Sequence, residues 1–258
     1  MTRIASHRGG TLEYGDSTWA GFSATASMSV DEVEFDIHPT ADGRIIVHHD
    51  AILDDTTDTR GAIVEMSAEA VRRAIVNNAG AGFRHPLFLE DLCAIFEKSP
   101  VGFRCEIKPG RDGRPYADFV PRAIAVLDNA GLLEKTGFSS FFIDTLVELS
   151  EATTRPMLWL VSPPVLQQVG RRGVIELACT RGLTEIGVHI DTADSDLMDE
   201  VTAAGLAFGC WAAHSKEQIE KAFDLGVKVF TTDRPSLAMA IRDARTGTGP
   251  VAETEIAP

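Results

Sequence analysis

Two acidic residues stand two positions apart inside an apolar stretch, Val33-Glu34-Phe35-Asp36-Ile37. Residues two apart along a strand point to the same face, so the stretch predicts two carboxylates on one side of a strand. Burying two neighbouring carboxylates is costly unless a cation or hydrogen bonds compensate them. The pattern therefore indicates a metal site, built on Glu34 and Asp36.

Two histidines are placed to work beside such a site. His7 ends the apolar stretch Arg3–Arg8, and His49 ends the apolar stretch that follows a turn at residues 41–43. A hairpin centred on that turn predicts that His49 lies opposite Glu34, while strand alternation turns His48 to the other face. Because imidazoles titrate near neutral pH, we interpret His7 and His49 as an acid and base pair. Which one is the acid stays open.

A third acid and two cations complete the candidate site. Glu106 and Lys108 share one face of the stretch Phe103–Lys108. Three carboxylates with no paired Cys or His nearby suit Mg²⁺ or Ca²⁺, and the sequence does not choose between the two ions. Arg8 and Lys108 are the expected phosphate-binding groups. The alternative is that these acids only form ion pairs with Arg8, Arg104 and Lys108 inside a sheet.

Short apolar segments alternate with amphipathic ones along most of the chain, which is typical of parallel strands joined by helices. Eight strands are predicted: Arg3–Arg8, Val33–Ile37, Phe103–Lys108, Thr136–Phe141, Met157–Val161, Glu185–Ile190, Ala207–Ala212 and Lys228–Thr232. Helices are expected between most of them, among others at Tyr116–Ala130, Asp144–Thr153, Val165–Thr180, Ser195–Ala204 and Ser215–Leu225. We therefore expect an α/β protein with a TIM-like (β/α)8 barrel.

One apolar segment does not fit this alternation. Arg44–Asp50 follows Asp36 too closely for a helical crossover, so we interpret it as the antiparallel arm of a hairpin after the second strand. Residues 51–88 then form a small insertion, with a short helix at Ser67–Val76. We expect one barrel domain over 1–245 and a disordered tail over 246–258.

Composition limits the kind of ligand and the setting. The chain has 258 residues and a formal net charge of −14, which argues against nucleic acid and favours a small anionic substrate. No apolar run is long enough for a membrane span, and no secretory leader is evident, so we expect a cytoplasmic protein without membrane insertion. Its four scattered cysteines are expected to be reduced thiols, with Cys105 and Cys210 inside strands. The oligomeric state stays open, a homodimer included.

The ordered set of motifs resembles the glycerophosphodiester phosphodiesterase family. The matching residues are His7-Arg8-Gly9, Glu34-x-Asp36, Asp42-Gly43, Val47-His48-His49-Asp50, Thr56-Thr57, Glu106-Ile107-Lys108, Ser140-Phe141, Trp211 and Thr232-Asp233-Arg234-Pro235. The resemblance implies a divalent metal on Glu34, Asp36 and Glu106, and hydrolysis of a glycerophosphodiester to an alcohol and glycerol 3-phosphate. It also implies that Trp211 packs against the alcohol moiety. A plain core Trp is the competing interpretation.

Two departures from the family pattern bear on substrate choice. The chain reads Gly15-Asp16-Ser17-Thr18 where the family usually has Pro-Glu-Asn-Thr, and Ala212-Ala213-His214 where Thr-Val-Asn is common. We predict that Asp16 influences specificity, the alternative being a solvated residue at a helix start. His189 is a further candidate for lining the pocket. Two other functions stay open: a related barrel phospholipase or lyase acting on a phosphodiester headgroup, and a barrel that binds phosphorylated ligands without catalysis.

Overall fold

A computed structural model describes residues 1–77, 79–80 and 82–247 of the protein. Eight parallel strands form a closed ring, because β1 pairs with both β9 and β2. The strands are β1 (Arg3–His7), β2 (Glu32–Pro39), β4 (Gly102–Ile107), β5 (Thr136–Ser140), β6 (Met157–Val161), β7 (Glu185–His189), β8 (Ala207–Trp211) and β9 (Val229–Thr232). The predicted TIM barrel is confirmed, and most strand bounds differ from the predicted ones by one or two residues.

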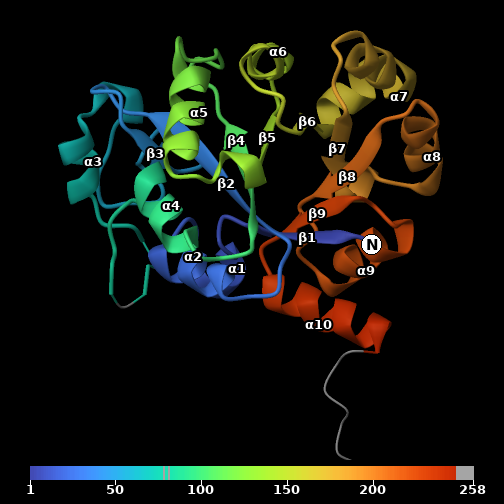
Figure 1. Cartoon of the computed structure of the whole chain (residues 1–258), viewed down its shortest axis with the longest axis horizontal. Helices are drawn as coiled ribbons and strands as arrows, with labels where there is room; N and C mark the ends of the chain where they lie inside the picture. The colour runs from blue at the N-terminus through green and yellow to red at the C-terminus, as the bar shows by residue number, and fades with distance from the viewer. Residues whose placement is uncertain (78, 81, 248–258) are drawn as a thin grey trace, which may run out of the picture.

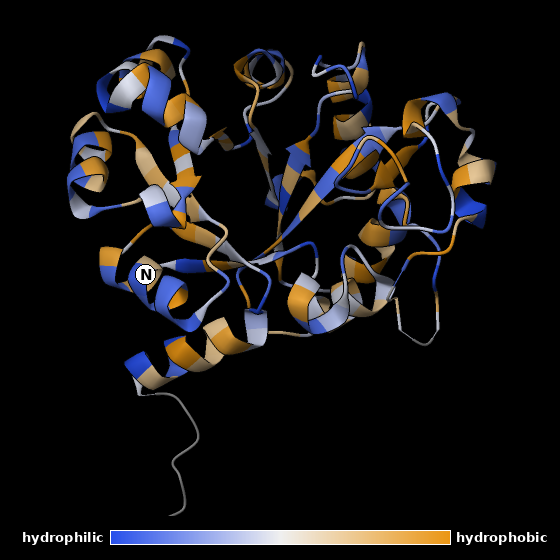
Figure 2. Ribbon diagram, turned by 180° about the vertical axis from the view of Figure 1, so that it is seen from behind, coloured by the Kyte–Doolittle hydropathy of each residue, from blue (hydrophilic) through white to orange (hydrophobic). Residues whose placement is uncertain are grey.

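Helices surround the strands (Figure 1), and apolar and polar residues alternate along most of them (Figure 2). The five segments predicted above correspond to α5 (Phe119–Asn129), α6 (Ile143–Ala152), α7 (Pro163–Thr180), α8 (Ser195–Ala203) and α9 (Lys216–Leu225). In the described part of the chain, four further α-helices had no predicted range: the short α1 (Thr11–Tyr14), α2 (Trp19–Ala26), α4 (Leu89–Phe96) and α10 (Pro235–Thr246).

Strand β2 shows how the sequence pattern positions the site. Its odd-numbered side chains are apolar, and Phe35 packs edge-on against Phe103 with ring centroids 5.1 Å apart. All eight residues of the strand are buried. The even-numbered residues, including Glu34 and Asp36, project to the other face, which is the inside of the barrel. Alternation therefore places carboxylates in the barrel interior, where only a cation or ion pairing makes them stable.

The predicted hairpin is present, but its predicted register is wrong by one residue. Strand β3 (Ile45–Val47) pairs antiparallel with β2, and Ile37 lies opposite Val47 rather than opposite Ile46. The turn sets this register: the Thr40 N–H donates to the Arg44 carbonyl at 2.8 Å, and Gly43 adopts a φ of 83°. His49 is therefore not paired opposite Glu34, and the regular ladder ends at Val47.

The insertion after β3 packs around a small apolar cluster of its own. This cluster consists of Ile46, Leu53, Ile63, Val71, Ala74 and Phe88. Within it, α3 (Ala68–Arg73) is capped by the Ser67 hydroxyl, inside the predicted range Ser67–Val76. At the other end of the chain, Thr246 closes α10, and residues 248–258 of the predicted tail lie outside the described residues.

Cys105 and Cys210 are buried in β4 and β8, and all four cysteines are free thiols. Among the described residues, no helix has the length and apolar character that a membrane span requires.

Candidate active site

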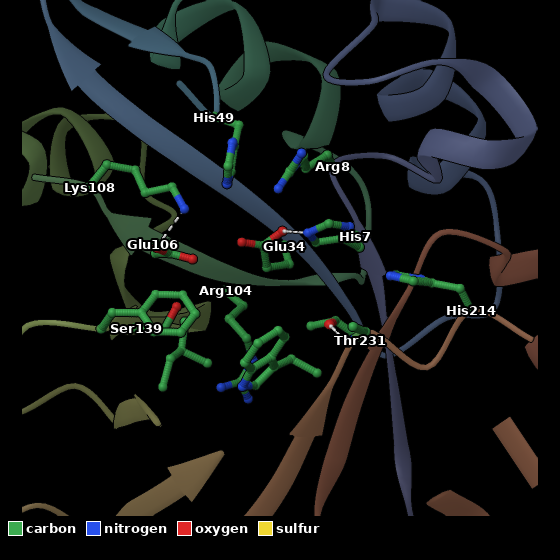
Figure 3. A pocket seen from close by; sticks show the side chains of 14 residues that line it. His7, Arg8, Glu34, His49, Arg104, Glu106, Lys108, Ser139, His214 and Thr231 are labelled. Atoms are coloured by element: carbon green, nitrogen blue, oxygen red, sulfur yellow. Dashed lines mark hydrogen bonds and ion pairs between the residues drawn. The ribbon is translucent and has the colours of Figure 1, made fainter. Parts of the chain in front are cut away.

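A cavity of about 260 Å³ opens at the carboxyl ends of the barrel strands. Active sites of this fold lie at that end of the barrel. Figure 3 shows His7, Arg8 and His49 directed toward Glu34, with Lys108 approaching from the β4 side. The lining side chains are those of His7, Arg8, Glu34, His49, Arg104, Glu106, Lys108, Ser139, Phe141, Leu160, Trp211, Ala212, His214 and Thr231.

Three carboxylates meet beside this cavity. Asp36 on β2 lies in register with Glu106 on β4, and Glu34, Asp36 and Glu106 each place an oxygen within 4.8 Å of the others. All three are buried. Within the described part of the chain, Glu34 Oε2 has no hydrogen-bond partner, and the two oxygens of Asp36 are contacted by ion pairs alone. Buried oxygen donors of this kind fit a hard divalent cation.

Two cations border the carboxylate cluster. Lys108 Nζ lies 3.1 Å from Asp36 Oδ1 and 2.8 Å from Glu106 Oε1. Arg8 Nε lies 3.0 Å from Asp36 Oδ2. Burial alone would raise the pKa of Asp36, but the charges of Lys108 and Arg8 hold it well below its usual range. Asp36 therefore stays ionised.

The other two acids respond differently to burial. Burial, together with the charges of Asp36 and Glu106, raises the pKa of Glu34 well above its usual value. Burial also raises the pKa of Glu106, to about 7, against the opposing effect of Lys108. Lys108 and Arg8 thus do not fully offset the charge of the three carboxylates, and a divalent cation held there would supply further positive charge. Arg104 does not supply it, because its guanidinium turns away to Glu32 at 2.7 Å.

His7 enters the cavity from the end of β1. Its Nδ1 lies 2.5 Å from Asp233 Oδ1, just beyond β9. A carboxylate can only accept, so Nδ1 carries the proton of this hydrogen bond. Nε2 then faces the cavity, 3.8 Å from Glu34 Oε2. This is the geometry of an imidazole held by one nitrogen and reactive at the other.

His49 reaches the same cavity from the segment after β3. Its Nδ1 lies 2.7 Å from Asp50 Oδ1, and burial lowers the pKa of the ring. The structure thus brings both predicted histidines to one cavity despite the altered hairpin register. His48 points elsewhere: it is buried, and its Nε2 lies 2.6 Å from Thr56 Oγ1.

Two aromatic side chains, Phe141 and Trp211, form an aromatic wall of the cavity. Trp211 ends β8 and packs edge-on against Phe141, with centroids 5.5 Å apart. Its indole Nε1 is buried without a partner among the described residues. His189 packs against the other side of Trp211 at 4.7 Å and does not line the cavity itself.

Asp16 lies behind Arg8 and outside this cavity. Its Oδ2 accepts a hydrogen bond from Arg8 Nη1 at 2.7 Å. It lines an adjoining groove formed by α1 and the insertion. The structure therefore connects Asp16 to the site through Arg8.

Sequence reasoning did not single out several residues that the structure adds to the site. Asp233 belongs to the motif after the last strand, yet its bond to His7 depends on barrel closure. His214 lines the cavity, and its Nδ1 accepts the Asp233 N–H at 3.0 Å. The buried hydroxyl of Ser139 faces the cavity without a partner among the described residues. A polar residue at the end of an apolar strand was the available signal for Asp233 and Ser139.

A closed α/β barrel with a carboxylate cluster and two histidines at its strand ends defines a barrel enzyme. Comparison with known proteins identifies the family to which this enzyme belongs. The sequence model of the glycerophosphoryl diester phosphodiesterase family matches residues 7–237. A crystal structure from Agrobacterium tumefaciens, of a protein named for the same family, is 61% identical, with a TM-score of 0.94, over 96% of this chain and 99% of that one.

More distant relatives support the same family assignment. A glycerophosphodiester phosphodiesterase of Bacillus altitudinis is 23% identical over 94% of this chain and 99% of its own length. A phosphodiesterase of Oleispira antarctica, solved with its product sn-glycerol 3-phosphate, has the same fold, with a TM-score of 0.77 and 18% identity over 94% of this chain and 97% of that one. The chain belongs to the glycerophosphoryl diester phosphodiesterase family. It is accordingly an enzyme that hydrolyses phosphoric diesters.

Proposed function

We propose that this enzyme hydrolyses glycerophosphodiesters to an alcohol and glycerol 3-phosphate, in a reaction that needs a divalent cation and uses His7 and His49 as acid and base. One observation carries the proposal. Each imidazole is bound to a carboxylate through Nδ1, and both rings line the one cavity that holds Glu34 and Glu106.

Cleavage of a phosphodiester requires two proton transfers. One histidine removes the proton from the attacking oxygen, which belongs to water or to a glycerol hydroxyl. The new P–O bond forms as the bond to the alcohol oxygen breaks, and the other histidine protonates that leaving oxygen. If a glycerol hydroxyl attacks first, water then opens the cyclic phosphate. Binding each Nδ1 to a carboxylate keeps both Nε2 atoms available for these transfers.

We expect the two cationic side chains of the cavity to hold the phosphate. Arg8 and Lys108 line the cavity and carry the positive charge that nonbridging oxygens attract. Glu34, Asp36 and Glu106 would hold Mg²⁺ or Ca²⁺. When bound, the cation supplies further positive charge where negative charge develops on phosphorus oxygens.

The aromatic wall is expected to hold the organic part of the substrate. Trp211 and Phe141 offer apolar surface, and the unpartnered Trp211 Nε1–H offers a donor for a hydroxyl oxygen. The product bound by the Oleispira relative, sn-glycerol 3-phosphate, combines these two parts and guides our choice of substrate. We propose that Asp16 tunes this binding indirectly, by holding Arg8.

Product analysis tests the proposal. The enzyme is incubated with glycerophosphodiesters that carry small and large alcohol groups, and the phosphorus products are identified by NMR. We expect glycerol 3-phosphate. Accumulation of a cyclic phosphate would favour the lyase or phospholipase alternative, and binding without turnover would favour a barrel that only binds phosphorylated ligands.

The metal is tested separately from activity. Titration calorimetry of chelator-treated protein with Mg²⁺ and with Ca²⁺ should show binding in the wild type and loss of binding in Glu34→Gln and Asp36→Asn. Glu65→Gln, which changes an exposed acid outside the cavity, is the matched control. Equal binding by all four proteins would remove the carboxylate cluster as the metal site.

A further inference from the structure

His38 is a buried histidine that the proposed reaction does not use. It lies near the end of β2 and is 1% exposed. Its Nδ1 lies 2.9 Å from the Tyr116 hydroxyl oxygen, and its Nε2 lies 3.0 Å from the main-chain carbonyl oxygen of His49. The imidazole therefore bridges the loop between β4 and α5 to the backbone of a candidate catalytic residue.

The direction of these hydrogen bonds follows from the groups involved. A carbonyl oxygen can only accept, so His38 Nε2 must donate to His49. In a neutral imidazole one nitrogen donates and the other accepts, so with Nε2 donating to His49 the Nδ1 atom accepts from the Tyr116 O–H. The result is a chain of two hydrogen bonds, in which Tyr116 donates to His38 and His38 donates to the peptide carbonyl of His49.

The two ends of this hydrogen-bond chain, Tyr116 and the His49 backbone, differ in how firmly their surroundings hold them. The Tyr116 ring lies edge-on to His38, with centroids 5.8 Å apart, and packs on Phe119 at the start of α5 at 5.6 Å. The His49 backbone has less support. The β2–β3 ladder ends at Val47, and the His48 N–H donates to the Asp36 carbonyl at 2.9 Å as the last bond to β2.

The side chain of His49 is also held lightly on its outer side. Its Nδ1 partner Asp50 has a side chain that is 41% exposed. Surface contacts of this kind contribute little to the free energy that fixes a geometry. The buried bond from His38 to the His49 carbonyl is therefore the firmest contact that we find at this residue among the described parts of the chain.

We propose that Tyr116 and His38 are positioning residues that fix the peptide of His49 and so aim its imidazole into the cavity. The inference rests on the proposed role of His49. It adds residues outside the cavity, since neither Tyr116 nor His38 lines it. It also connects His49 to the loop that begins at Lys108, so the phosphate-binding lysine and the histidine are held by one framework.

Removal of a single oxygen tests the proposal. Tyr116→Phe keeps the ring packing and deletes only the donor to His38. Because small displacements of a catalytic group are costly, we expect kcat to fall roughly 5- to 50-fold while KM stays within about twofold. Tyr14→Phe makes the same chemical change outside the cavity and is the matched control, with unchanged kcat expected.

Variants of His38 provide a second measurement. Gln carries both a donor and an acceptor on its side chain, so His38→Gln should retain most of the wild-type kcat. His38→Leu removes both and should lower kcat at least as much as Tyr116→Phe does. Because the three groups act as one chain, the double variant His38→Leu with Tyr116→Phe should be no worse than His38→Leu alone.

Two results would overturn the inference. One is wild-type kcat in both Tyr116→Phe and a folded His38→Leu. The other is a loss of thermal stability in Tyr116→Phe with kcat unchanged, which would make the bridge purely structural. If His38→Leu does not fold, Tyr116→Phe decides alone. If His49→Ala itself turned over normally, the proposed function would fail instead, so the two failures are distinguishable.

Discussion

Asp233 Oδ1 lies 2.5 Å from His7 Nδ1, on the side of the imidazole that faces away from the carboxylate cluster. Burial alone would raise the pKa of Asp233, but the hydrogen bond and charge of His7 keep it low. An ionised carboxylate at Nδ1 fixes the tautomer of the ring and leaves Nε2 for chemistry. Barrel closure between β1 and β9 creates this pair.

Asp233→Asn tests this pairing. An amide can donate to Nδ1 as well as accept from it, so the variant permits the wrong tautomer. We expect kcat to fall by on the order of 10–10³, with a smaller effect on KM. Steady-state kinetics provide the measurement, and Asp128→Asn, on the exposed end of α5, is the control. Unchanged kcat in Asp233→Asn would remove the carboxylate from the mechanism.

Loss of either candidate catalytic histidine should be severe. His7→Ala and His49→Ala are each expected to lower kcat by on the order of 10²–10⁴, the usual contribution of a general acid or base. Circular dichroism and thermal melting should show that both variants fold. His85→Ala, in the insertion and outside the cavity, should leave kcat unchanged. Near-normal turnover in either active-site variant would take the catalytic role from that residue.

The raised pKa of Glu106 predicts an unusual pH dependence of stability. In the folded protein without metal this carboxyl keeps its proton up to about pH 7, whereas its ordinary value is 4.5. The folded state thus binds more protons between these values. The stability that this group contributes is complete below the lower pKa and is lost as pH rises through the higher one.

Chemical denaturation of metal-free protein at several pH values measures the effect. Between about pH 5 and pH 8, the wild type should lose on the order of 1–3 kcal/mol more unfolding free energy than Glu106→Gln does. The comparison with Glu106→Gln cancels the titrating groups that lie outside the carboxylate cluster. Adding Mg²⁺ or Ca²⁺ at the higher pH should restore the stability of the wild type. Parallel curves for the two metal-free proteins would contradict the prediction.

Asp16→Glu is expected to alter substrate preference. Asp16 accepts a hydrogen bond from Arg8 Nη1, so a longer side chain must shift the guanidinium that is expected to contact phosphate. We predict a change of about 1–2 kcal/mol in relative kcat/KM between a small and a large glycerophosphodiester, the scale of one methylene in a pocket. If both substrates change by the same factor, Asp16 has no part in specificity.

The sequence alone predicted the barrel, the hairpin and half of the residues that line the cavity, namely His7, Arg8, Glu34, His49, Glu106, Lys108 and Trp211. The reason is that these features depend on local spacing. A period of two places Glu34 and Asp36 on one face of β2, and the short connection from Asp36 to Ile45 forbids a helical crossover. Strand ends in a parallel barrel share one rim, so His7 and Glu106 were expected together without knowledge of the full packing.

Other features depend on contacts that local spacing does not encode. The hydrogen-bonded loop from Thr40 to Arg44 fixed the hairpin register, which overturned the predicted pairing of His49 with Glu34. Arg104 was a candidate partner of the site acids, yet it binds Glu32 and lies near Glu185 on the far side of the barrel.

The partners of His7 and His38 likewise depend on contacts between segments that are distant in the sequence. His7 and Asp233 are 226 positions apart, and they meet because the last strand closes against the first. His38 and Tyr116 are 78 positions apart and meet because the β4–α5 loop folds over the end of β2. The sequence determined on which strand faces and at which strand ends the predicted site residues stand, since alternation and strand order are properties of the chain. The tertiary structure decided which neighbours hold them, because those contacts arise only when distant segments pack together.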